Sequence, residues 1–157
     1  MAADLHELYH QDFKIKKLSA KQKSKFKKHS LKYFPAAVSI ILHIITMGIF
    51  TIIFYGVQHG KFPKAHPKDF GTGKAIGFMF IPFFNYYWLF MFWLRMADRI
   101  NFQFKLRNKT PRVEKGLVIA TCVIQFIPYV GLLSYFVLFP IMIGFVQGGI
   151  NELARIK

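Results

Sequence analysis

The chain has 157 residues, and its 22 Lys and Arg against 7 Asp and Glu give a formal net charge of +15. It is also 54% hydrophobic, with 19 Phe and 7 Tyr, which excludes a disordered basic chain and is unusual for a small soluble domain. A single cysteine, Cys122, excludes a disulfide-stabilised secreted domain and a cysteine-based zinc site.

Charged and apolar residues are separated along the chain. No Asp, Glu, Lys or Arg occurs in residues 33–60, 75–94 or 116–151. Each of these three apolar windows exceeds the roughly 18 charge-free residues that indicate a membrane-embedded segment. The sequence therefore predicts an all-α integral membrane protein, with a basic cytoplasmic arm at residues 1–33 and a membrane domain at residues 34–157.

The arm combines two patterns. Its first part has apolar side chains at helical spacing, which predicts a short amphipathic helix: Leu5, Leu8, Tyr9 and Phe13. Nine lysines and no acid follow between Lys14 and Lys32. A lysine cluster beside a membrane segment is typical of anionic-lipid binding, with about 1 kcal/mol from each residue near the surface. The lysines assigned to the lipid surface are Lys21, Lys23, Lys25, Lys27 and Lys28.

Two other roles for the lysine cluster are open. It could act only as a topology signal, since basic segments tend to stay on the cytoplasmic side. It could instead bind nucleic acid. The aromatic residues that would stack on bases lie almost entirely inside the apolar windows, so no nucleic-acid partner is predicted.

Each apolar window contains a helix break near its middle. The breaks are predicted at Gly48, Pro82 and Pro128, because glycine accepts the dihedrals of a bend and proline removes a backbone donor. The Ile-Pro-aromatic sequence around Pro82 recurs around Pro128. We interpret the windows as a weak threefold repeat of a helix–break–helix unit. Kinked spanning helices are the alternative, since membrane helices tolerate Pro and Gly.

Two topologies fit these windows. With three spans, the charged segments alternate between the two sides, and the positive-inside tendency places the N-terminus in the cytoplasm. With re-entrant hairpins, all charged segments share the cytoplasmic face, which agrees with every one of them being basic. As a straight helix, the third window would reach about 54 Å, beyond a hydrocarbon core of about 30 Å. The sequence favours hairpins, alone or combined with spans.

Residues 73–88 resemble a motif of small bacterial membrane proteins that has the pattern GKAxGFxFIPFFNxYW. Residues 45–50 are similar to the TxGI(Y/F) signature of related families of unknown function, and Asp98-Arg99-Ile100-Asn101 fits the same pattern. The resemblance covers roughly residues 30–151 and implies a multi-pass protein of the bacterial cytoplasmic membrane. These families have no assigned activity, so the resemblance implies no catalytic residue.

Three polar side chains inside the windows are candidate intramembrane sites: His43, Asn85 and Gln125. His43 shares a helical face with Ser39 and Thr46, which is compatible with a proton relay, a haem ligand or a metal ligand. Hydrogen bonding between helices is the commoner role of such residues in membrane proteins, and we expect it for all three.

No set of nucleophile, base and orienting residue can be assembled from the sequence, so neither an enzyme nor a cofactor or metal site is predicted. The predicted function is that of a non-enzymatic structural or scaffold membrane protein, or of an accessory subunit. Such a protein would self-associate or join a larger membrane complex on an anionic bilayer. A small channel or transporter is the alternative, because broken helices at mid-membrane form ion sites in transporters.

Overall fold

The computed structural model of the chain describes residues 18–63 and 69–156. Within these residues all regular structure is helical and no strand is present, which confirms the all-α prediction. The amphipathic helix expected between Leu5 and Phe13 lies outside the described residues.

The helices follow one another with short connections. In chain order they are α2 (Ala20–Lys27), α3 (Ala36–Ile45), α4 (Ile49–Lys61), α5 (Thr72–Gly77), the 3-10 turn η2 (Phe78–Phe80), α6 (Phe84–Leu106), α7 (Lys115–Ile124), α8 (Val130–Phe136) and α9 (Leu138–Arg155).

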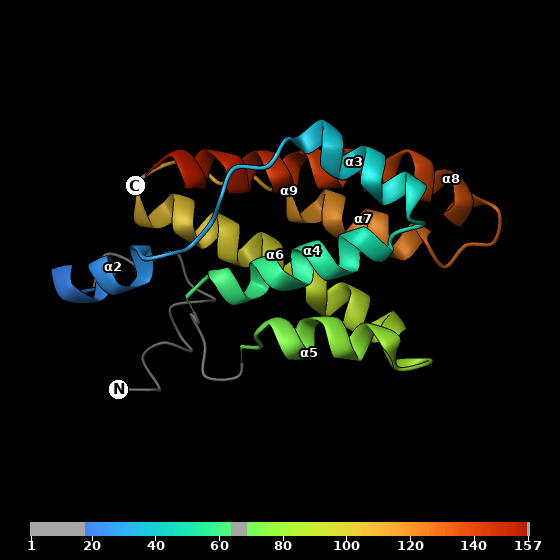
Figure 1. Cartoon of the computed structure of the whole chain (residues 1–157), viewed down its shortest axis with the longest axis horizontal. Coiled ribbons are helices and arrows are strands. Elements are labelled where there is room, and N and C mark those ends of the chain that lie inside the picture. The colour runs from blue at the N-terminus through green and yellow to red at the C-terminus, as the bar shows by residue number, and fades with distance from the viewer. Residues whose placement is uncertain (1–17, 64–68, 157) are drawn as a thin grey trace.

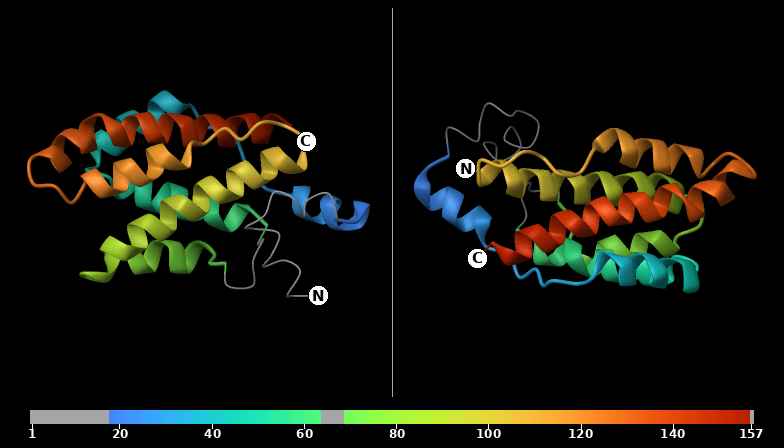
Figure 2. Two further views of the ribbon diagram at one scale, coloured as in Figure 1. Left: turned by 180° about the vertical axis from the view of Figure 1, so that it is seen from behind. Right: turned by 90° about the horizontal axis from the view of Figure 1, so that it is seen from above.

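Each apolar window folds as one helix, a turn and a returning helix (Figure 1). Hairpin 1 consists of α3 and α4, hairpin 2 of α5, η2 and α6, and hairpin 3 of α7, α8 and α9. The three turns lie at the same end of the molecule in all views, and the chain enters and leaves every hairpin at the opposite end (Figures 1 and 2). We call these the tip end and the base end.

The turn of hairpin 1 is closed by local hydrogen bonds. Met47 and Gly48 both have positive φ angles, of 50° and 88°. The Thr46 hydroxyl donates to the Leu42 carbonyl at 2.6 Å and accepts from the Phe50 amide at 3.0 Å. The left-handed conformation of Gly48 and the hydroxyl of Thr46 therefore end α3 and start α4 within three residues.

The turns of hairpins 2 and 3 share one backbone structure. The Phe84 amide donates to the Pro82 carbonyl, and the Val130 amide donates to the Pro128 carbonyl, each at 2.7 Å. The central residues are Phe83, with φ 61° and ψ −39°, and Tyr129, with φ 62° and ψ −44°. Both are γ-turns of the rare, strained kind with positive φ. The sequence repeat around Pro82 and Pro128 is thus a repeat of structure as well.

Helix α6 organises the core, since it packs against α2, α7 and α9. Its side chains Phe92, Trp93 and Met96 are at most 1% exposed. Against α9 the backbones approach so closely that a Cβ on Gly149 would lie 2.9 Å from Ile100. The hydrophobic core is therefore built largely from side chains of α6 and α9.

Helix α6 ends earlier than the sequence suggests. Proline interrupts helices, so Pro111 marks the expected end of the charged segment after residue 94, but α6 already stops at Leu106. Asn108 adopts a left-handed conformation with φ 56°, and the Lys109 amide donates back to the Phe104 carbonyl at 2.9 Å. A left-handed residue of this kind terminates a helix because it satisfies the last free carbonyls.

Candidate membrane-contact surface

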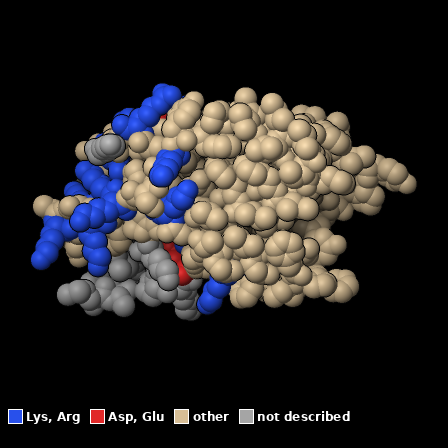
Figure 3. All heavy atoms as spheres, in the orientation of Figure 1, with Lys and Arg blue, Asp and Glu red and all other residues tan. Residues whose placement is uncertain are grey.

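Lysine and arginine side chains gather at the base end. Figure 3 shows them on one side of the molecule, while the part that extends to the tips carries none on the visible face. All charged residues lie outside the apolar windows, and folding each window back on itself brings the charged segments together. The fold converts a linear separation of charge into a polar end and an apolar body.

The apolar body is exposed. Every exposed large hydrophobic side chain among the described residues lies inside one of the three apolar windows. Soluble proteins rarely expose contiguous apolar surface beyond a few hundred Å². The exposed side chains of this body therefore indicate contact with lipid or with other protein.

The three tips carry the most exposed of these side chains. Met47 is 83%, Phe83 86% and Tyr129 94% exposed, and each has a positive φ angle. Strained residues at a functional site persist when the surrounding structure imposes them. Here the strain places a large apolar or aromatic side chain at the outermost point of each hairpin.

His43 lies inside hairpin 1 with its neighbours at hydrogen-bonding distance. Its Nδ1 is 2.8 Å from the Thr51 hydroxyl, and its ring stacks on Phe139 with a centroid distance of 5.5 Å. The Tyr135 hydroxyl donates to the His43 carbonyl at 2.8 Å. No group of three His, Cys, Asp or Glu that could hold a metal exists among the described residues. The contacts of His43 join hairpin 1 to hairpin 3.

Asn85 and Gln125 lie elsewhere. Both are next to the turns of hairpins 2 and 3, and their side-chain oxygens are shielded from solvent without a partner among the described residues. Asn85 also lines a small pocket with Pro82 and Phe83. The structure does not bring these two residues together with His43 into one polar path.

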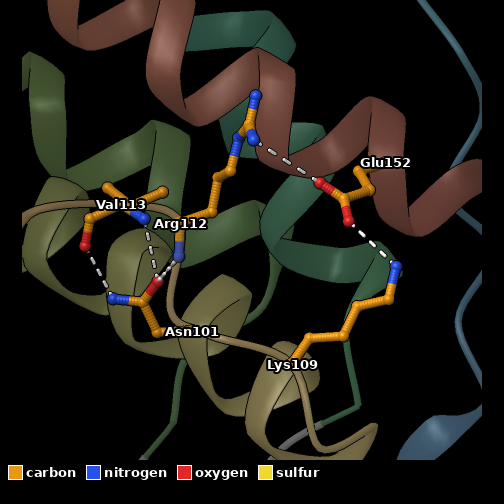
Figure 4. A network of polar contacts seen from close by, with 5 residues as sticks. All are labelled: Asn101, Lys109, Arg112, Val113 and Glu152. Atoms are coloured by element: carbon orange, nitrogen blue, oxygen red, sulfur yellow. Dashed lines mark hydrogen bonds and ion pairs between the residues drawn. The ribbon is translucent and has the colours of Figure 1, made fainter.

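Asn101 fixes the start of hairpin 3, a role that the sequence does not reveal. Its Oδ1 accepts from the amides of Arg112 and Val113 at 3.1 and 3.0 Å, and its Nδ2 donates to the Val113 carbonyl at 2.7 Å (Figure 4). Nearby, Glu152 pairs with Lys109 at 3.0 Å and with Arg112 at 3.8 Å. Hairpin 3 is thereby attached to α6.

Asn151 fixes the start of hairpin 1. Its Oδ1 accepts from the Phe34 amide at 3.0 Å, and its Nδ2 donates to the Phe34 carbonyl at 2.8 Å. Gln147 adds a bond to that carbonyl at 3.1 Å. The sequence shows an Ile-Asn pair at residues 100–101 and again at 150–151, and Gln147 four residues before Asn151, but neither pattern identifies Phe34 as the partner.

Arg99 holds the start of hairpin 2. Its guanidinium donates to the His59 carbonyl at 2.5 Å and to the Phe70 carbonyl at 2.7 Å, and lies 3.5 Å from the Asp69 carboxylate. Arg99 is 2% exposed, so this buried charge is compensated by both a carboxylate and carbonyl acceptors. Sequence reasoning did not single it out, because its partners lie 29 to 40 residues away.

At the base end, α2 is fastened to α6. Gln103 donates to the Phe26 carbonyl at 2.7 Å and Arg107 to the Lys27 carbonyl at 3.1 Å. The lysines assigned to the lipid surface therefore occupy a docked helix and the residue after it, rather than a free chain. Of the five, Lys23 is half-buried and the other four are exposed: Lys21, Lys25, Lys27 and Lys28.

A pocket of about 820 Å³ opens beside α2. Lys23, Lys27, Lys28, His29 and Arg107 contribute its polar lining. Burial, followed by the charge of Arg107, lowers the pKa of His29 below its ordinary value of 6.5. The pocket is thus a concentration of positive charge.

One helical stretch among the described residues, Val130–Arg155, is long and apolar enough to cross a membrane, and 39% of its most apolar part is buried. A core helix of a soluble protein can meet the same criteria, so its length alone does not establish a span. A scan against protein-family models and searches of curated proteins and solved structures find no match to this chain.

Proposed function

We propose that this is a membrane-embedded structural protein that enters the bilayer from one side through its three helical hairpins. The observation that carries the proposal is the distribution of side chains. Among the described residues, every exposed large hydrophobic side chain except Tyr33 belongs to the hairpins or their turns, and the basic side chains gather at the common base. In such a position the hairpins contact hydrocarbon and the basic end contacts anionic headgroups.

The lengths of the helices support partial insertion. Helices α3 and α7 have 10 residues each and reach about 15 Å, and α4 with 13 residues reaches about 20 Å. A hydrocarbon core measures about 30 Å. Because the three tips lie at the same end of the molecule, these short helices favour tips that end within the bilayer, although Val130–Arg155 of hairpin 3 is by itself long enough to cross it. With its tips inside the bilayer, the protein acts as a wedge in the leaflet that it enters.

A structural role follows from this shape. A wedge with a basic base displaces lipid in one leaflet, and its exposed apolar faces allow copies to associate side by side. The protein accordingly shapes the membrane or scaffolds a larger complex. The basic base and the resemblance to bacterial membrane families favour the cytoplasmic side of a bacterial inner membrane, with the N-terminus in the cytoplasm.

A channel or transporter is supported less well. The polar side chains of the tips, Asn85 and Gln125, are separated from His43, whose contacts are with Thr51 and aromatic rings. An ion path would need polar groups that continue from one side of the bilayer to the other.

Cysteine labelling tests the topology. In a Cys122→Ala background, single cysteines replace Ser24 and Lys74 at the base, or Phe83 and Tyr129 at the tips, and a membrane-impermeant thiol reagent is applied to intact cells and to inverted vesicles. We expect both base positions to react from the cytoplasmic side only and both tip positions from neither side. Reaction of a tip from the outer side, or of the two base positions from opposite sides, would establish spanning helices instead.

A further inference from the structure

We infer that the pocket beside α2 is a binding site for the phosphate of an anionic phospholipid headgroup. The inference rests on the proposed membrane location and adds a defined site to it. The phosphate would be bound by Lys23, Lys27 and Arg107, with Lys28 and His29 at the wall.

The pocket is formed by three segments that are distant in sequence. The α2 helix and the residues after it supply Lys23, Lys27 and Lys28, the end of α6 supplies Arg107, and the end of α9 supplies Ala154 and Ile156. Its volume of about 820 Å³ falls within the range of small-molecule sites. Such a pocket exists only in the folded chain, unlike a flexible lysine-rich tail.

The cations of the pocket lack carboxylate partners among the described residues. The four acids in that part of the chain all make contacts elsewhere. Asp69 contacts Arg99, Asp98 pairs with Lys115, Glu114 caps α7, and Glu152 pairs with Lys109 and Arg112. Within the described residues, no carboxylate therefore balances the positive charge of the pocket, which favours the binding of an anion.

Arg107 is held in place by neutral acceptors. It donates to the Gln103 side chain at 2.6 Å and to the Lys27 carbonyl at 3.1 Å, neither of which neutralises its charge. A guanidinium that is fixed in this way loses little conformational freedom when it binds phosphate. The pKa of His29 is lowered first by burial and then by the charge of Arg107, which shows that the guanidinium acts on the wall of the pocket.

The rest of the lining favours a lipid over a free anion. Leu31, Ala154 and Ile156 form an apolar side of the same pocket, and the first apolar window starts at residue 33. A phospholipid has a phosphate next to glycerol and acyl carbons, so it matches a lining with one basic and one apolar side. None of the described residues that line the pocket is Phe, Tyr or Trp, which disfavours stacking of a nucleotide base.

Two double variants on the same helix separate this site from a diffuse charged surface. Lys23→Gln/Lys27→Gln removes two charges that line the pocket, and Lys21→Gln/Lys25→Gln removes two that do not. The full chain, purified in neutral detergent, is titrated with phosphatidylglycerol, phosphatidylcholine, glycerol 3-phosphate or inorganic phosphate. Binding is followed by the rise of the thermal unfolding midpoint and by native mass spectrometry.

We expect saturable binding of phosphatidylglycerol but not of phosphatidylcholine. The pocket pair should weaken it at least about tenfold and the control pair by less than about threefold, because screened surface charges contribute little. Arg107→Lys, which keeps the charge but loses the planar fork, should also weaken it.

Equal losses in the two pairs would overturn the pocket while leaving the topology result intact. Inorganic phosphate that binds as tightly as the lipid would instead make the pocket a site for free anions.

Discussion

Replacing Asn101 by alanine should release the start of hairpin 3. The substitution removes three hydrogen bonds at 2.7 to 3.1 Å. Val113 is 3% exposed, so its amide and its carbonyl would both be left buried without a partner. Each unsatisfied buried group costs about 1–3 kcal/mol, and the part-buried Arg112 amide adds less. The expected loss of stability is therefore about 3–5 kcal/mol.

Cys122 reports on this loss locally. It lies on α7, soon after the segment that Asn101 holds, and its side chain is fully buried. When α7 opens to allow thiol labelling, each 1.4 kcal/mol of lost stability accelerates the reaction about tenfold. In mild detergent, labelling of Cys122 in the Asn101→Ala variant should be at least about 100-fold faster than in the unmodified protein.

A control in the same network sharpens the test. Lys109→Gln removes only the ion pair with Glu152, in which the two side chains are 45% and 33% exposed. Exposed pairs contribute at most about 1 kcal/mol, so labelling should change by less than about tenfold. If Asn101→Ala labels no faster than Lys109→Gln, the amide of Asn101 does not hold hairpin 3, and the reasoning from buried hydrogen bonds is wrong.

Two further predictions concern α4 and the base. Gly56→Ala should destabilise the protein by about 1–3 kcal/mol, because the new Cβ would overlap the Ile76 side chain. Gly77→Ala is the control and should be nearly neutral, since nothing lies within 4 Å of its Cβ. Thermal unfolding of both variants in detergent tests the difference. His29 has a pKa lowered by burial and by Arg107, so its contribution to stability should be present above about pH 6.5 and lost as the pH falls. Between about pH 7.5 and pH 5, the thermal unfolding midpoint should therefore decline less in His29→Gln than in the unmodified protein. An equal decline in the two proteins would contradict this.

The sequence predicts the local part of the fold well. Helix breaks near Gly48, Pro82 and Pro128 follow from backbone chemistry that acts within a few residues, and the turns lie at these positions in the structure. The absence of charge from the apolar windows indicates membrane-embedded segments, and the exposed large hydrophobic side chains of the described residues do lie in these windows. What the sequence does not contain is the position of α2, because its contacts with Gln103 and Arg107 span 77 and 80 residues.

For the polar residues too, the sequence predicts local contacts but not long-range ones. His43 was expected to hydrogen-bond between helices, and its contact joins α3 to Thr51 on α4, only eight residues away. Asn151 lies four residues after Gln147, a spacing that places both on one helical face, but its main partner is Phe34, 117 residues away. Helical spacing identifies which residues share a face, whereas the partner of that face depends on how the hairpins assemble.

The three long-range polar contacts have one physical cause. Where the chain leaves the base and begins a new hairpin, the backbone is not yet helical, so its amides and carbonyls need partners. Several of these segments are buried, as Val113 is, and an unpaired backbone group away from water is costly. Asn151, Arg99 and Asn101 each supply the bonds at the start of a different hairpin, and each belongs to a returning helix. Because Arg99 and Asn101 both lie on α6, that helix fixes the start of hairpin 3 and the start of its own hairpin at once.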